Sequence, residues 1–115
     1  TWTHTCIDND NTLARIASVD VHFKLSGESF VWDTEKALQN VRKHGIRFDE
    51  AAGVFFDPLF IIVDASRNAE ARNAAIGFDV SGRLLYVVHV GFEENCIRII
   101  SARRATAGEE RDYAQ

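Results

Sequence analysis

Residues 96–106, CIRIISARRAT, decide the fold, because they carry an apolar strand directly into a helix start. The isoleucines on either side of Arg98 alternate with it, and this period of two predicts a strand with one buried face. Thr106 and Glu109 have the spacing of a capping box, in which each side chain accepts from a backbone amide of the other. A strand that brings arginines to a helix N-terminus can gather several anion-binding groups, whereas the alternative is an edge strand with solvated arginines.

The composition is that of one globular domain, with 115 residues of which 46% are hydrophobic. A net charge of −4 argues against nucleic-acid binding through overall charge, although local arginine clusters could still bind it. Cys6 and Cys96 have no metal-site spacing and make no disulfide framework. No apolar run approaches the ~20 residues that cross a bilayer, and no secretory signal is visible, so we expect a cytoplasmic protein without membrane contact.

The N-terminal part is predicted to be an extension, residues 1–28, ahead of a main domain over residues 29–115. Residues 1–17 are polar and without a sustained period, so a loose lead-in is expected. Residues 18–25 alternate between apolar and polar types, which predicts a possible extra strand, and after a turn at 26–29 a short second strand is predicted at 30–32.

Two helices are predicted next. The first begins after the N-cap Asp33, runs to His44 and ends at Gly45, a residue that readily adopts the left-handed conformation. One of its faces is polar and carries Lys36, Asn40 and Lys43. A shorter helix is predicted over residues 48–56, before a proline ends it.

Beyond this proline the pattern changes to strands. The apolar run 59–63, which ends in three β-branched residues, predicts a central strand, and further strands are predicted at 72–79, at 84–92 and in the arginine-bearing stretch. A capped helix closes the chain over residues 106–115. The predicted fold is therefore α+β, with two N-terminal helices, an antiparallel sheet of about four strands and a C-terminal helix.

The chemistry available is cationic. No glycine-rich phosphate loop, zinc spacing or carboxylate cluster is present, and the remaining candidate side chains are Lys43, His44, Arg72, His89, Arg98, Arg103, Arg104 and Tyr113. Such a set suits an anionic transition state handled without a metal or other cofactor. Cleavage of RNA is the natural example, since the 2′-hydroxyl loses a proton, the leaving oxygen gains one, and fixed positive groups stabilise the phosphorane. Spacing alone leaves the reaction open.

Three groups of motifs occur in one order over about residues 29–113. They are WD at 32–33 with KHGI at 43–46, E-x-R at 70–72 ahead of GRLLYVVH at 82–89, and IRIISARRAT at 97–106 with Glu109 and Tyr113. Together they resemble the signature of the BrnT toxin family. The resemblance implies a RelE-like fold and a ribonuclease toxin of a type II toxin–antitoxin pair. It also implies a BrnA-like antitoxin as partner, with RNA as substrate and with DNA contacted only through the antitoxin.

The resemblance also implies roles for individual residues. Phosphate and transition-state charge would be handled by Arg72, Arg98 and Arg103, proton transfer by His89, and base contact by Tyr113; the RNA-binding group would be Lys43, His44 and Arg104. A histidine between two valines is also typical of a satisfied core residue. If residues 93–95 form a three-residue loop, His89 pairs with Ile99 and faces away from Arg98, and a shift of one residue reverses this.

A non-catalytic or inactive toxin-like module that holds an antitoxin is the alternative function. Ala107 and Gly108 stand where relatives often carry arginine, which lowers the positive charge beside the helix cap. Two observations separate the hypotheses: whether Arg72, Arg98 and Arg103 meet in a solvent-open cleft, and whether expression arrests growth.

Overall fold

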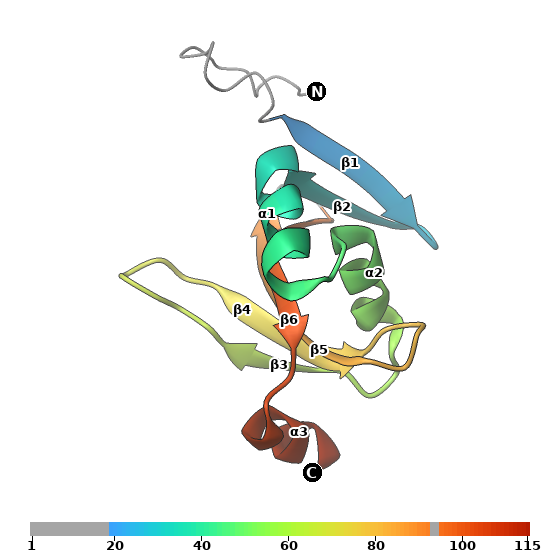
Figure 1. Cartoon of the computed structure of the whole chain (residues 1–115), viewed down its shortest axis with the longest axis vertical. Coiled ribbons are helices and arrows are strands. Elements are labelled where there is room, and N and C mark those ends of the chain that lie inside the picture. Colours follow the sequence, from blue (N-terminus) through green and yellow to red (C-terminus); the bar gives the residue numbers. More distant parts are fainter. Residues whose placement is uncertain (1–18, 93–94) are drawn as a thin grey trace.

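The computed structural model of the protein describes residues 19–92 and 95–115, so the predicted lead-in over residues 1–17 lies outside the described residues. The described part forms one six-stranded sheet with the order β1-β2-β6-β5-β4-β3 (Figure 1). In chain order the elements are β1 (Asp20–Leu25), β2 (Glu28–Asp33), α1 (Thr34–His44), α2 (Phe48–Ala52), the 3₁₀ helix η3 (Gly53–Phe56), β3 (Ile61–Asp64), β4 (Asn73–Phe78), β5 (Leu84–Phe92), β6 (Cys96–Arg104) and α3 (Ala107–Ala114). Among these residues, none of the helices has the length and apolar character needed to cross a membrane.

The sheet is larger than predicted, and it is mixed rather than antiparallel. β1 and β2 form an N-terminal hairpin, and β2 then pairs in parallel with β6, from Ser29 opposite Cys96 to Val31 opposite Arg98. The prediction of two N-terminal helices and about four antiparallel strands is therefore wrong, although the chain is still α+β. A parallel pair requires a long connection, which here is the whole chain between β2 and β6, so no local pattern could indicate it.

The strand predicted to be central lies at an edge of the sheet. β3 pairs with β4 and with no other strand of the described chain, and Ile62 in its middle is 48% exposed. A run of β-branched residues indicates a strand, but it does not say how many neighbours the strand has.

The predicted ends of the first and last helices are confirmed, whereas the helix predicted over residues 48–56 is divided into α2 and the 3₁₀ helix η3. The Asp33 carboxylate accepts from the Lys36 amide at 3.0 Å to begin α1, and Gly45 ends the helix with φ 71°. At α3, the Thr106 hydroxyl accepts from the Glu109 amide, and the Glu109 carboxylate accepts from the Thr106 amide. The arginine-bearing strand therefore leads directly into a helix that is fixed at its first turn.

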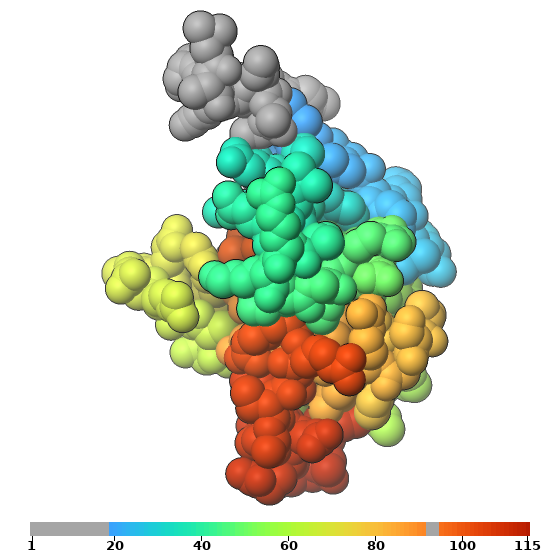
Figure 2. Space-filling view, in the orientation of Figure 1, coloured from blue at the N-terminus to red at the C-terminus, as the bar shows by residue number. Residues whose placement is uncertain are grey.

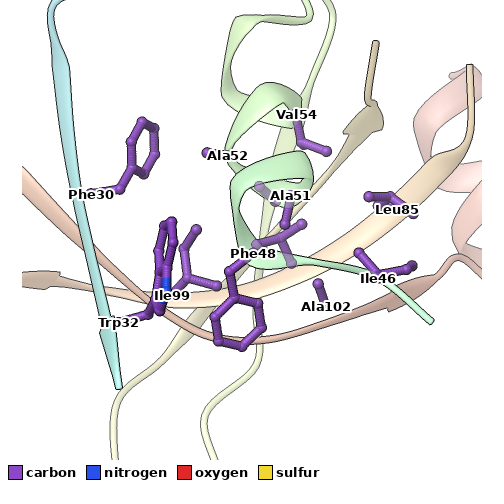
Figure 3. Close-up of a cluster of buried hydrophobic side chains, with 12 residues drawn as sticks. Phe30, Trp32, Ile46, Phe48, Ala51, Ala52, Val54, Leu85, Ile99 and Ala102 are labelled. Atoms are coloured by element: carbon purple, nitrogen blue, oxygen red, sulfur yellow. The ribbon is translucent and has the colours of Figure 1, made fainter. Parts of the chain in front are cut away.

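The core lies between α2 and one face of the sheet, which we call the core face (Figure 3). Ile46 and the first residues of α2 pack against the inward side chains of β2, β5 and β6, and Phe48 lies against Trp32 with ring centroids 5.8 Å apart. The largest fully buried side chains include Phe30, Phe48 and Ile99. The core is therefore built from α2, from β2 before it in the chain, and from β5 and β6 after it.

Asn40 joins α1 to the edge of β6. Its side chain is buried, its Nδ2 donates to the carbonyls of Ile46 at 2.9 Å and Ala102 at 2.8 Å, and its Oδ1 accepts from the Ala102 amide at 3.0 Å. β2 pairs with β6 only as far as Arg98, so this carboxamide takes the place of a neighbouring strand further along. The C-terminal end of α1, with His44, is thereby held beside the second half of β6.

Candidate functional site

A cleft of about 430 Å³ opens on the face of the sheet opposite the core face. Its walls come from the end of α1, the β3–β4 hairpin, the middle of β5 and the second half of β6. The lining residues are His44, Ala65, Ser66, Arg67, Arg72, Tyr86, Val88, Ser101 and Arg103, which together we call the arginine cleft.

A β-bulge sets which side chains of β6 reach the arginine cleft. Val88 pairs with Ser101 and His89 pairs with Ile99, so Ile100 is the extra residue on β6. In a strictly alternating strand Arg103 would lie on the same face as Ile99, which is in the core. The bulge shifts the alternation by one residue and moves Arg103 to the cleft side.

Arg103 is the most strongly held cation of the cleft. Its Cζ lies 4.1 Å from the centre of the Tyr86 ring, since these two residues are opposite each other in the ladder. Its Nη1 and Nη2 donate to the two carboxylate oxygens of Glu109, each at 2.9 Å. This hydrogen-bonded pair raises the pKa of Arg103 and lowers the pKa of Glu109, so both groups are ionised at neutral pH.

The β3–β4 hairpin supplies the opposite wall. It projects from one side of the molecule (Figure 2) and turns tightly at Asn68 and Ala69, both of which have positive φ. Arg72 at the base of this hairpin lines the cleft, and its Nη2 lies 2.7 Å from Oε1 of Glu70. The Glu70 side chain is 69% exposed whereas that of Arg72 is 29% exposed, so solvent screens this ion pair from the outside.

Three sequence-predicted residues therefore meet in the cleft: His44, Arg72 and Arg103. Lys43 and Arg104 are exposed and do not line it. As neighbours of His44 and Arg103 in the chain, they lie near the cleft rather than in it.

His89 is on the core face of β5. The predicted pairing with Ile99 is observed, the residue is 7% exposed, and its ring packs edge-on against Phe55 with centroids 4.9 Å apart. Its Nδ1 lies 3.1 Å from the Val87 carbonyl, and burial lowers the pKa of the imidazole. The side chain is thus on the other side of the sheet from the arginine cleft.

Arg98 and Tyr113 are also outside the cleft. Arg98 lies opposite Val90, and its Nη2 is 2.8 Å from a carboxylate oxygen of Asp20 on β1. The Tyr113 hydroxyl donates to Asp57 at 2.7 Å, which raises the pKa of the phenol. These contacts tie β6 to the N-terminal hairpin, and α3 to the loop before β3.

Sequence reasoning missed four polar residues of the cleft: Ser66, Arg67, Tyr86 and Ser101. A signal existed for Tyr86, because side chains two apart share a face of a strand and Tyr86 alternates with the core residues Leu85 and Val87. Arg67 lies in a polar connection with no period, and no local pattern shows which way it faces.

A comparison with known families gives one match. The family model described as the ribonuclease toxin BrnT of type II toxin–antitoxin systems matches residues 32–109. No curated protein matches the chain. The matched range extends from the end of β2 into the first turn of α3, and it contains every residue that lines the arginine cleft.

Proposed function

Since the chain belongs to the BrnT family of ribonuclease toxins from type II toxin–antitoxin systems, we propose that this protein cleaves RNA in the arginine cleft. The observation that carries the proposal is the meeting of Arg72 and Arg103, from separate elements, in one solvent-open cleft beside His44. Guanidinium groups on two walls can hold one phosphate between them. An antitoxin partner follows from family membership, and we propose that it is BrnA-like and that the toxin acts in the cytoplasm.

The two arginines would stabilise the negative charge that develops on the phosphate in the transition state. His44, at the exposed end of α1, would transfer the proton between the 2′-hydroxyl and solvent or the leaving oxygen. Lys43 and Arg104 would contact RNA that extends beyond the cleft. Because the guanidinium groups supply the positive charge that a metal ion could otherwise provide, the proposed cleavage needs no bound metal.

His89, Arg98 and Tyr113 would serve the fold rather than the reaction. His89 packs in the core, and the other two form the ion pair with Asp20 and the hydrogen bond to Asp57. Replacing His89 by Phe keeps an aromatic ring against Phe55, so we expect cleavage to continue.

Cleavage of a short single-stranded RNA by the purified protein tests the proposal. Arg72→Ala and Arg103→Ala should each slow cleavage about 10²-fold, the order found when one donor to a transition-state anion is removed. Arg42→Ala, at an exposed site of α1 outside the cleft, is the matched control and should cleave as wild type does. Cleavage should continue in the presence of a metal chelator.

Two results would contradict the proposal. One is a wild-type protein that leaves RNA intact and permits normal growth when expressed without antitoxin, which would favour the non-catalytic antitoxin-binding module. The other is cleavage that survives both arginine substitutions but is lost in His89→Phe.

A further inference from the structure

Arg103 uses only part of its hydrogen-bonding capacity within the protein. A guanidinium carries five N–H donors. Three of them are used: Nη1 donates to the Arg104 carbonyl at 3.1 Å and to Glu109 Oε1 at 2.9 Å, and Nη2 donates to Glu109 Oε2 at 2.9 Å. The Nε–H and the second Nη2–H have no partner among residues 19–92 and 95–115.

These two remaining donors lie side by side on one edge of the guanidinium plane. Parallel N–H groups in this arrangement match two oxygens of one phosphate. Glu109 occupies the other edge, so a phosphate could bind Arg103 without displacing the carboxylate. The ion pair therefore leaves a bidentate phosphate-binding edge available on the residue that lines the cleft.

The orientation of this edge is fixed from two directions. The Tyr86 ring lies against one face of the guanidinium at 4.1 Å, which restrains its tilt. The Glu109 carboxylate restrains rotation in the plane, and it is itself held because Oε1 also accepts from the Thr106 amide at 2.8 Å. The Glu109 side chain is 18% exposed, so water competes weakly for these bonds.

We propose that Glu109 and Tyr86 are positioning residues, which orient Arg103 so that its Nε–Nη2 edge is presented to a phosphate diester of RNA in the arginine cleft. The proposal rests on the proposed function for the identity of the ligand. It assigns to the capping glutamate of α3 a second role beyond starting the helix. It also explains why a carboxylate beside the cleft need not weaken phosphate binding.

The direct test follows the Arg103 Nε–H signal by NMR while a dinucleotide with a 2′-O-methyl group, which cannot be cleaved, is added. In the wild-type protein the signal should shift on binding. In Glu109→Gln, the dinucleotide should bind about tenfold more weakly, because the amide can still cap α3 but offers Arg103 only one acceptor. Glu110→Gln, the next and exposed residue of α3, is the matched control and should bind like wild type.

Cleavage provides the second measurement. Glu109→Gln should slow cleavage about tenfold, and it should add nothing in an Arg103→Ala background, because a positioning residue acts only through its partner. Tyr86→Leu should also slow cleavage, and Tyr86→Phe, which keeps the ring under the guanidinium, should restore most of the rate. Urea unfolding of each variant identifies any general loss of stability.

The outcomes separate this inference from the proposed function. If the Arg103 signal shifts as expected and Glu109→Gln binds the dinucleotide more weakly, but the wild-type protein does not cleave RNA, the positioning role stands and the ribonuclease proposal fails. If cleavage depends on Arg103 but Glu109→Gln binds and cleaves as well as wild type, or better, the positioning role fails. A wild-type Arg103 Nε–H that does not respond to the dinucleotide would overturn it as well.

Discussion

Among the polar residues that form no ion pair, Asn40 is the one whose replacement we expect to lower the free energy of unfolding most. Asn40→Leu exchanges the carboxamide for an apolar group of similar size and removes hydrogen bonds of 2.9, 2.8 and 3.0 Å. Ala102 and Ile46, which supply the partner groups, are 0% and 1% exposed, so water cannot replace the lost bonds. An unsatisfied buried polar group costs about 1–3 kcal/mol, and for three such groups with partial relaxation we expect a loss of about 4 kcal/mol.

Urea unfolding followed by the fluorescence of the buried Trp32 measures this loss. With a dependence of about 1.5 kcal/mol per molar urea, the midpoint should fall by roughly 2–3 M. Gln39→Leu, the exposed neighbour on the same helix, is the control and should change the free energy of unfolding by no more than about 0.5 kcal/mol.

A change below about 1 kcal/mol for Asn40→Leu would refute the reasoning, because it would mean that the β6 edge does not depend on the carboxamide. A second readout examines the link to the site. Since Asn40 holds the end of α1 beside β6, the variant should also cleave RNA more slowly under conditions in which it is fully folded. Normal cleavage by a destabilised but folded protein would show that His44 is positioned by other contacts.

Three further predictions concern the titratable groups. Asp79→Ala should lower the free energy of unfolding by about 3 kcal/mol in urea unfolding, because the buried Asp79 Oδ2 lies 2.7 Å from Arg83 Nη2 and the arginine would be left with its longer ion pair, to Glu50 Oε1 at 3.2 Å. Burial lowers the pKa of His89, so the unfolded state binds the proton at a higher pH than the folded state does. The free energy of unfolding of the wild-type protein should therefore decrease as the pH falls through 6.5, the ordinary pKa of histidine. His89→Phe should show a smaller decrease when urea unfolding is compared at pH 7.5 and 5.5. Arg103 lowers the pKa of the Glu109 carboxylate, so the ionised carboxylate stabilises the folded protein. This stabilisation has its full value above the ordinary glutamate pKa of 4.5 and is lost as the pH falls further. Glu109→Gln should therefore lose less stability on acidification than Glu110→Gln, as measured by urea unfolding.

The sequence was informative where the physics is local. Helix caps depend on one side chain and an amide within four residues, so the limits of α1 and the capping box at Thr106 could be predicted. The six-stranded mixed sheet could not be predicted, because its parallel β2–β6 pair joins segments that no short-range pattern connects. Asn40 was assigned to a polar face for the same reason: its partners are backbone groups of Ala102 and Ile46, which carry no signature in residue type.

The candidate site shows a similar limit, and the bulge at Ile100 is its cause. Alternation from Ile97 and Ile99 would direct Arg103 into the core, where its charge could not be solvated. Ala102 takes that place instead, fully buried, because one extra residue shifts the phase between Ile99 and Ser101. The sequence Ala102-Arg103-Arg104 is compatible with either alternation, with or without an extra residue before it. Only the pairing with β5 determines which side of the sheet the Arg103 guanidinium faces.

The partners of Arg98 and Arg103 then decide what each arginine can do. Both lie on β6, and each forms an ion pair: Arg98 with Asp20 at 2.8 Å and Arg103 with Glu109 at 2.9 Å. Asp20 comes from the N-terminal hairpin and binds Arg98 away from the cleft, whereas Glu109 comes from the helix start beside the cleft and leaves one edge of Arg103 available. Residues 96–109 therefore place Arg103 in three steps. The β-bulge puts its side chain on the cleft side of the sheet, and the capping box holds the Glu109 carboxylate in place. That carboxylate in turn orients the guanidinium group, which we propose binds phosphate.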